Sequence, residues 1–255
     1  MLKQMLSTAA LASGLMLAMN TQAVEIEVNL YDPDNSGFWG SAYEWSYQYG
    51  NDLSNEMTVQ ATAWTNRSSW GDTRITQDLI SDWGNSGLGV EYANTPDHAI
   101  DNAKGKFDAV LLSFSEAVTL ESITAGWVRD NSSWRSDASV LAFTGNLNGE
   151  SIGSTIQDKQ WGDLVAADGG WSSAGNYRLS ESGVVNSDAV SQYWLVGAFN
   201  PSFGGSQPGN YGYTEDFFKL KSVTASVNPV PLPGSMLLFG AGLLGFGVIR
   251  RKRNA

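Results

Sequence analysis

The sequence predicts an all-β domain of the two-sheet β-sandwich or jelly-roll type, and three observations support this prediction. Apolar and polar residues alternate in several stretches, which is the period of a half-buried strand. Clusters of Gly, Asn, Asp and Ser separate these stretches and are typical of turns. No part of the body keeps a helical period over several turns, and no repeat of fixed length recurs. Short strands joined by such turns favour two packed sheets.

The expected strands follow one another along the chain. In residues 25–30 the strict alternation places Ile26, Val28 and Leu30 on one face of a strand. Residues 145–175 are predicted to be mostly turn and loop. Alternating or apolar stretches predict further strands at residues 57–64, 88–92, 107–114, 118–127, 139–144, 193–199 and 217–227.

The stretches 107–114 and 118–127 are predicted to be hairpin partners. Only Ser115, Glu116 and Ala117 lie between them, which is the length of a short hairpin connection. We therefore expect two neighbouring antiparallel strands here.

Aromatic residues are concentrated between residues 38 and 49. Tyr43, Trp45, Tyr47 and Tyr49 stand two apart and would share one face of a strand. Such a ladder either packs in the core or offers a flat surface for stacking. Core packing is the default interpretation, although ten tryptophans exceed what a small core ordinarily needs.

The body of the chain is strongly acidic. It holds all 26 acidic residues but only 10 of the 15 Lys and Arg residues, because Lys3 and four C-terminal bases belong to predicted targeting segments. Ten bases against 26 acids give the body a formal charge of −16. This charge argues against binding to nucleic acid or to an anionic membrane surface.

The chain contains no cysteine and a single histidine, His98. Disulfides, zinc thiolate sites and cysteine nucleophiles are thereby excluded, so the domain must be stabilised by core burial. A two-histidine metal site is impossible within one chain, and a Ser-His-Asp triad would have to include His98. We expect no cofactor other than the calcium ion considered next.

Oxygen-bearing side chains are concentrated around His98. Calcium takes about six to eight oxygen ligands, and Asp97, Asp101, Asn102 and backbone carbonyls could supply part of such a site. The competing interpretation is a turn in which Asp and Asn bond their own backbone. The turn is favoured, because the acids lack the spacing of an EF-hand.

The N-terminal segment has the features of a secretory signal peptide. Lys3 supplies a positive charge, residues 6–19 are apolar, and small residues occupy the two positions that a signal peptidase reads, of which Ala23 is the second. Residues 1–23 are therefore predicted to be removed by cleavage before Val24.

The C-terminal segment has three parts. Its prolines forbid a helix through Pro233. The sixteen uncharged residues 234–249 could then form a transmembrane helix of about 24 Å, somewhat shorter than the ~30 Å hydrocarbon core. A basic tail follows, which is predicted to stay cytoplasmic, so that the preceding domain lies outside. The tail consists of Arg250, Arg251, Lys252 and Arg253.

The order of these parts resembles the PEP-CTERM sorting signal in its Val-Pro-x-Pro variant. The motif residues are Val230, Pro231, Leu232 and Pro233, with Leu232 where the name-giving motif has Glu. The resemblance implies that an exosortase, a membrane transpeptidase, cuts near the prolines and passes the protein to the cell surface.

Parts of the body are also similar to the exosortase-dependent surface proteins that carry this signal. The similar stretches have no known chemistry. They are residues 87–90, 98–102, 107–114, 118–120, 193–200 and 216–223.

Together these features predict a signal peptide at residues 1–23, an extracellular β-sandwich domain at 24–227 and a sorting signal at 228–255. The resemblance implies a surface or extracellular-matrix protein of a Gram-negative bacterium that makes extracellular polysaccharide, with a transient inner-membrane anchor. We expect a non-enzymatic protein associated with this polysaccharide or with biofilm. The alternatives are a carbohydrate-binding module and, less favoured, a glycoside hydrolase that uses two carboxylates.

We predict that the exported protein begins at Val24, because small residues precede the bond that follows Ala23. N-terminal sequencing of the exported form checks this. A first residue within the apolar stretch 6–19, or upstream of it, would mean that the segment is retained as an anchor.

Overall fold

The computed structural model describes residues 23–31, 40–49, 57–66, 73–91, 98–128, 136–179, 182–208 and 215–227. All of them belong to one unit, Ala23–Asn228. Strands dominate this unit, and the only α-helix among the described residues is α1, Trp161–Leu164. The predicted all-β class is therefore confirmed.

Each stretch predicted as a strand contains strand residues, whereas β5, β7, β10 and β11 were not predicted. Short 3-10 turns connect some of the strands: η1 (Gly84–Ser86), η2 (Ala103–Gly105), η3 (Ile152–Thr155) and η4 (Pro201–Phe203). The strands are β1 (Val24–Asn29), β2 (Gly40–Ala42), β3 (Trp45–Tyr49), β4 (Met57–Asn66), β5 (Ile75–Asp82), β6 (Leu88–Glu91), β7 (Ile100–Asp101), β8 (Asp108–Val128), β9 (Ser136–Phe143), β10 (Trp171–Leu179), β11 (Ser182–Val184), β12 (Ser191–Ala198) and β13 (Phe217–Val227).

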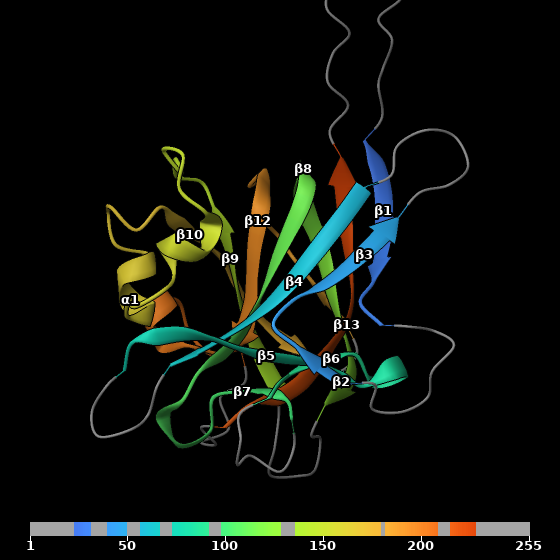
Figure 1. Ribbon diagram of the computed structural model, residues 1–255, viewed down its shortest axis with the longest axis horizontal. Coiled ribbons are helices and arrows are strands. Elements are labelled where there is room, and N and C mark those ends of the chain that lie inside the picture. Colours follow the sequence, from blue (N-terminus) through green and yellow to red (C-terminus); the bar gives the residue numbers. More distant parts are fainter. Residues whose placement is uncertain are drawn as a thin grey trace, which may run out of the picture. The chain divides into compact units, whose positions relative to one another are not determined.

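The thirteen strands of the described residues form one sheet (Figure 1). Its main order is β1-β13-β6-β5-β4-β8-β12-β9-β10, and β13 also pairs with β8. The strands β13, β6, β5, β4 and β8 therefore form a closed hydrogen-bonded ring. A sandwich or jelly roll of two separate sheets is not confirmed, because β8 belongs to both groups of strands.

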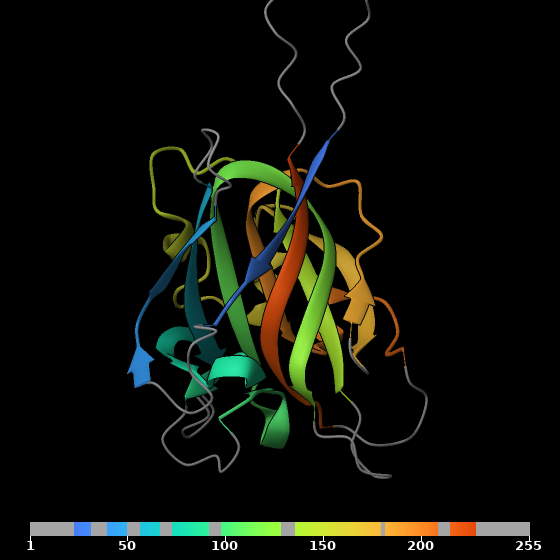
Figure 2. The same cartoon turned by 90° about the vertical axis from the view of Figure 1, so that its right-hand side faces the viewer.

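The predicted hairpin at Ser115, Glu116 and Ala117 is wrong, because these residues lie inside the continuous strand β8. The first part of β8 pairs with β4 and β12. Its second part pairs with β13 and β11, and Figure 2 shows β13 between this part and β1. All three residues are exposed and mark the point where β8 exchanges one pair of neighbours for the other.

The larger apolar cluster fills the space between the two groups of strands. Trp194 of β12 is fully buried at its centre, and its ring Nε1 donates to the carbonyl of Ser191 over 3.0 Å. Alternate residues of each strand point into this cluster, as the period of two requires. Its members include Val59, Ala61, Val110, Leu112, Val140 and Val196 from one group and Leu120, Ile123, Leu220 and Val223 from the other.

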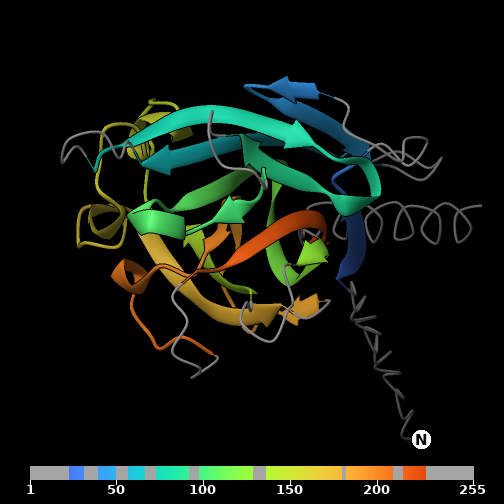
Figure 3. The ribbon, with the colours of Figure 1, turned by 90° about the horizontal axis from the view of Figure 1, so that it is seen from below.

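A second apolar cluster lies on the opposite face of β4, β8, β9 and β12. Strand residues Trp64, Leu111, Leu141 and Leu195 form its floor. The connection between β9 and β10, residues 144–170, covers this floor and includes α1 (Figures 1 and 3). The first part of β8 and the strands β9 and β12 are thus largely buried on both faces, which explains their apolar runs.

The first and last described strands lie side by side. β1 and β13 are antiparallel, and their register pairs Val24 with Val227. The exposed start of β1 and the end of β13 therefore lie at the same end of the unit (Figure 2).

The apolar stretch predicted to cross the membrane, residues 234–249, lies outside the described residues. Within the described ranges, none of the helices has the length and apolar character needed to traverse a bilayer.

We predict that Gly89→Ala destabilises the protein by about 1–3 kcal/mol or more. A Cβ atom at Gly89 in β6 would lie 1.8 Å from the carbonyl oxygen of His98, so the backbone would have to move. Thermal unfolding of the full chain measures the effect.

The matched control is Gly162→Ala in α1. Its added Cβ would meet nothing closer than 3.8 Å, and Ala is the better helix former, so stability should stay equal or rise. An unchanged melting temperature in Gly89→Ala would contradict the close approach seen here.

Candidate functional site

The connection between β9 and β10 runs from residue 144 to residue 170 and is much longer than a tight hairpin needs. Connections of this length in compact domains are often functional. The amides of Thr144 and Gly145 both donate to the carbonyl of Gly170 over 2.9 Å, which closes the base of the connection. The segment is therefore an elaborated hairpin loop with a defined neck.

Apolar side chains fix this connection on the sheet. Ile156, Trp161 and Leu164 are buried in the second apolar cluster. The Nε1 of Trp161 donates to Oδ1 of Asn66 over 3.1 Å. The Nε1 of Trp171 donates to Oγ1 of Thr155 over 3.1 Å. Both tryptophans therefore anchor the connection from below.

Main-chain hydrogen bonds tie the connection to β5. The amide of Ile75 donates to the carbonyl of Lys159, and the amide of Asp158 donates to the carbonyl of Ile75, each over 2.8 Å. Asp163 accepts the amide of Gln160 at the start of α1 over 2.9 Å, as a capping carboxylate does. The connection is thus held on two sides.

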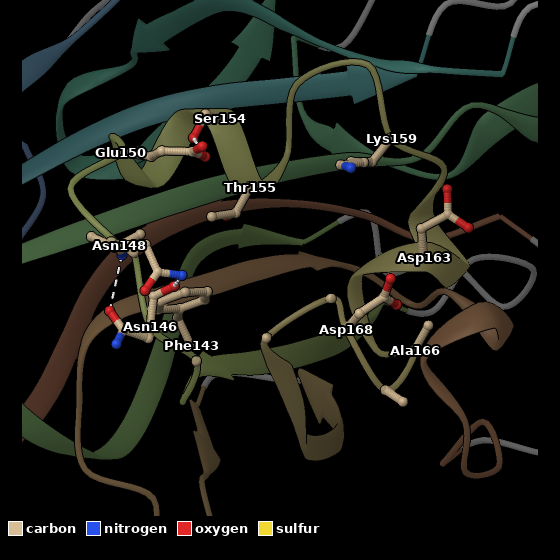
Figure 4. A pocket seen from close by; sticks show the side chains of 15 residues that line it. Phe143, Asn146, Asn148, Glu150, Ser154, Thr155, Lys159, Asp163, Ala166 and Asp168 are labelled. Atoms are coloured by element: carbon tan, nitrogen blue, oxygen red, sulfur yellow. Dashed lines mark hydrogen bonds between the residues drawn. The ribbon is translucent and has the colours of Figure 1, made fainter.

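The outer side of the connection forms an open pocket of about 550 Å³ (Figure 4). This volume lies within the range of small-molecule sites, about 300–1,000 Å³. The lining is mostly polar, with three carboxylates, two amides, two hydroxyls and one ammonium group. These groups belong to Glu150, Asp163, Asp168, Asn146, Asn148, Ser154, Thr155 and Lys159.

One aromatic ring, that of Phe143, takes part in the lining. The ring packs edge-on against Trp171 and Tyr193, with centroids 5.3 and 6.2 Å away. Gly170 has a φ of +76°, and a Cβ there would lie 2.7 Å from the Phe143 ring. Glycine at this position therefore lets the backbone pass close to the ring in a left-handed conformation.

Hydrogen bonds within the chain occupy most of the polar groups of the pocket, with the exception of two side chains. Ser154 donates to Glu150 over 3.1 Å, and the amide of Asn148 donates to Oδ1 of Asn146 over 2.9 Å. The side chains of Lys159 and Asp168 make no hydrogen bond or ion pair with the described residues. The pocket can therefore offer both donors and acceptors to a ligand.

Sequence reasoning missed this site, because residues 145–175 were predicted to be mostly turn and loop. The structure places η3, α1 and the start of β10 in this range. A signal was present in the spacing of Ile152, Ile156, Trp161 and Leu164, which indicates a local apolar underside. Short elements of four residues give too few periods for recognition.

The aromatic ladder is divided by the structure. Tyr43 precedes β3 and is 64% exposed, whereas Trp45 packs against the larger cluster and donates to the carbonyl of Ile80 over 3.3 Å. The side chains of Tyr47 and Tyr49 lie outside the described part. Four further tryptophans, Trp64, Trp161, Trp171 and Trp194, are buried, as the core interpretation expects.

The predicted calcium ligands lie partly outside the described residues, since Asp97 is not among them. Asp101 is buried, and its Oδ1 accepts the amide of Ala103 over 2.9 Å. No three described His, Asp or Glu side chains are grouped closely enough to hold a metal ion. The calcium site stays a prediction.

Asn102 joins three segments of the chain. Its Nδ2 donates to the carbonyl of Phe199 over 2.9 Å and to Oδ2 of Asp216 over 2.8 Å. Its Oδ1 accepts the amide of Asp216 over 2.6 Å. The side chain therefore holds the start of β13 beside the end of β12, which is a structural role.

Asp216 is a buried carboxyl with a strongly altered pKa. Burial raises the pKa of Asp216 to about 7, and the charge of Asp137 acts in the same direction. The hydrogen bonds from the amide of Asp137, over 2.8 Å, and from Asn102 oppose this effect. Burial, reinforced by the charge of Asp101, likewise raises the pKa of Asp108 well above its usual range. These carboxyls lie at the ends of strands, away from the pocket.

The other predicted site residues fall into two groups. Ala23 and Val24 lie at the start of β1, where both are exposed. The residues Val230, Pro231, Leu232, Pro233, Arg250, Arg251, Lys252 and Arg253 lie outside the described part.

We predict that the free energy of unfolding falls as the pH rises from about 4 to about 7. In this interval Asp216 ionises in the unfolded chain, where its pKa is ordinary, but stays protonated in the folded chain. The contribution of protonated Asp216 to the free energy of unfolding is fully present below about pH 4 and is lost by the time the pH passes 7. The difference is up to about 4 kcal/mol. Denaturant unfolding of the full chain at several pH values measures this.

The variant Asp216→Asn isolates the effect. The side-chain amide of the variant is neutral at every pH, so the free energy of unfolding should depend less on pH. It should also be lower by a constant amount, because an Nδ2 atom at this position cannot accept the hydrogen bond from Asn102. Asp188→Asn, at an exposed position, should keep the wild-type slope. Equal slopes in all three proteins would contradict the raised pKa.

A match to a known protein family lies in the C-terminal segment. A family model described as the PEP-CTERM protein-sorting motif matches residues 229–253. This match spans the prolines, the apolar run and the basic tail. No curated protein and no solved structure matches the chain significantly. The chain therefore carries a PEP-CTERM sorting motif in its C-terminal region, which marks it as an exported protein targeted to an exosortase for surface sorting.

Proposed function

We propose that this is a non-enzymatic surface or extracellular-matrix protein of a Gram-negative bacterium. An exosortase processes it at the proline motif after a transient stay in the inner membrane, and the body then associates with extracellular polysaccharide. The observation that supports this function is the sorting motif at residues 229–253.

The physical chemistry of the C-terminal segment fits this route. Three prolines between residues 229 and 233 keep the backbone extended, the form in which a peptide enters a protease-like active site. The apolar run behind them reaches about 24 Å as a helix, and the four bases hold the tail in the cytoplasm. The bond to be cut then lies outside the inner membrane.

The body has the character of a displayed domain. Its charge of −16 favours solubility outside the cell, and burial alone stabilises it because the chain has no cysteine. The pairing of β1 with β13 fixes residues 24 and 227 in the sheet, so that removal of the flanking segments leaves these strands paired. A β-sheet body of this kind serves as a scaffold for a binding site.

A second candidate function is that of a carbohydrate-binding module, which the polar pocket on the β9–β10 connection favours. The pocket is open and lined by carboxylates, amides and hydroxyls around the edge of one aromatic ring. Sugars offer a hydroxyl donor and acceptor on nearly every carbon atom, which such a lining can bind.

We predict that the double substitution Pro231→Ala and Pro233→Ala leaves the protein unprocessed in the inner membrane. Without the prolines the segment loses its extended form and can continue the following helix. Cell fractionation and the mass of the C-terminal fragment measure processing.

Pro208→Ala is the control, because Pro208 is an exposed proline of the body. This variant should be processed like the wild type. Normal release of the double variant would rule out the sorting function and leave a simple membrane anchor.

A further inference from the structure

The polar pocket on the β9–β10 connection has an unbalanced charge. We propose that it binds a saccharide whose sugar rings carry free amino groups. This proposal rests on the carbohydrate-binding function proposed above and names the class of sugar. It is derived from the charge, spacing and rigidity of the lining groups.

The charge of the lining selects a cationic ligand. The lining holds three carboxylates, those of Glu150, Asp163 and Asp168, and a single ammonium group, that of Lys159. The body around them has a formal charge of −16, so its field adds to the local one. A uronate or sulfated sugar would be repelled, whereas an amino sugar would be attracted.

The three carboxylates are not grouped like the ligands of a single metal ion. They come from three places in the connection: Glu150 precedes η3, Asp163 lies in α1, and Asp168 follows α1 (Figure 4). Among the described residues, no three acidic or histidine side chains are close enough to share one ion. Separated carboxylates fit a ligand with several cationic or hydroxyl groups.

The remaining lining groups fit the rest of a sugar. Asn146 and Asn148 present amides that both donate and accept, as ring hydroxyls require. The part of the Phe143 ring that lines the pocket supplies a small apolar surface for the C–H groups of a sugar ring, beside the backbone of Gly145 and Gly170. Charge and hydroxyl recognition are thus combined in one pocket.

The pocket is rigid before any ligand arrives. The buried Ile156, Trp161 and Leu164 fix its underside, and the hydrogen bonds from the amides of Ile75 and Asp158 hold residues 158–159 against β5. A preformed site loses little conformational entropy on binding. The exposed carboxylates can therefore contribute to affinity although each ion pair at the surface is weak.

Binding is measured by titration calorimetry on the full chain in detergent at about pH 6, where ordinary Asp and Glu side chains are ionised. The probes are a fully deacetylated glucosamine tetramer, its N-acetylated counterpart, a galacturonate tetramer and a lysine tetrapeptide. We expect the glucosamine tetramer to bind at least about tenfold more tightly than the other three.

Two sets of variants locate the binding. Glu150→Gln with Asp168→Asn should weaken binding of the glucosamine tetramer about tenfold, because two ion pairs are lost. The matched control, Glu116→Gln with Asp188→Asn, removes the same charge at exposed positions outside the pocket and should bind like the wild type. Ala167→Trp fills the pocket without a change of charge and should abolish binding.

The outcomes separate the proposals from one another. If the lysine tetrapeptide bound as tightly as the glucosamine tetramer, the binding would reflect only general attraction to an acidic surface. The same would follow if the pocket variant and the control variant lost equal affinity for the glucosamine tetramer. Either result would overturn the amino-sugar site. Preferred binding of the acetylated tetramer would overturn the choice of sugar but leave the carbohydrate-binding function standing. Reducing ends are assayed in the same samples, and their release would contradict the non-enzymatic function alone. Sorting is independent of all these results.

Discussion

The fold depends on the hydrogen bonding of one strand, β8, on both of its edges. Its first part lies between β4 and β12, and its second part lies between β13 and β11. Because one unbroken backbone takes part in both groups of strands, their relative placement is fixed by covalent connection as well as by packing. A chain without cysteine thereby obtains a rigid link between the groups, and the larger apolar cluster fills the space between them.

The same arrangement creates the site. The strands β4, β8, β9 and β12 have apolar side chains on both faces, and only one face meets the other group of strands. The opposite face must be covered, because exposure of Leu111, Leu141 and Leu195 to water would be costly. The β9–β10 connection provides this cover from its apolar side, so its polar side is left facing solvent as a pocket. Binding capacity here is a consequence of how the second face is buried.

Acidic residues have opposite roles in the two regions. At the strand ends, Asp216 and Asp108 are buried, so their pKa values rise and Asp216 serves as a partner of Asn102. In the pocket, Glu150 and Asp168 are exposed and can meet a ligand. Burial, and not residue type, therefore separates structural carboxyls from those available for binding.

The sequence by itself determined the all-β class, the position of most strands and the sorting motif, because these depend on local periods and on a contiguous order of residues. It could not determine that residues 115–117 continue β8, since a polar exposed triplet occurs both in turns and where a strand changes its neighbours. It also could not place Asp216 beside Asn102, because long-range pairing of strands brings these two segments together. Nor could it place Glu150 and Asp168 in one pocket, because the shape of their connection depends on its packing against the sheet. Tertiary structure alone decided the closed ring and the buried carboxyls, since both depend on contacts between segments distant in sequence. It also decided the pocket, because the β9–β10 connection takes its shape by packing on the sheet.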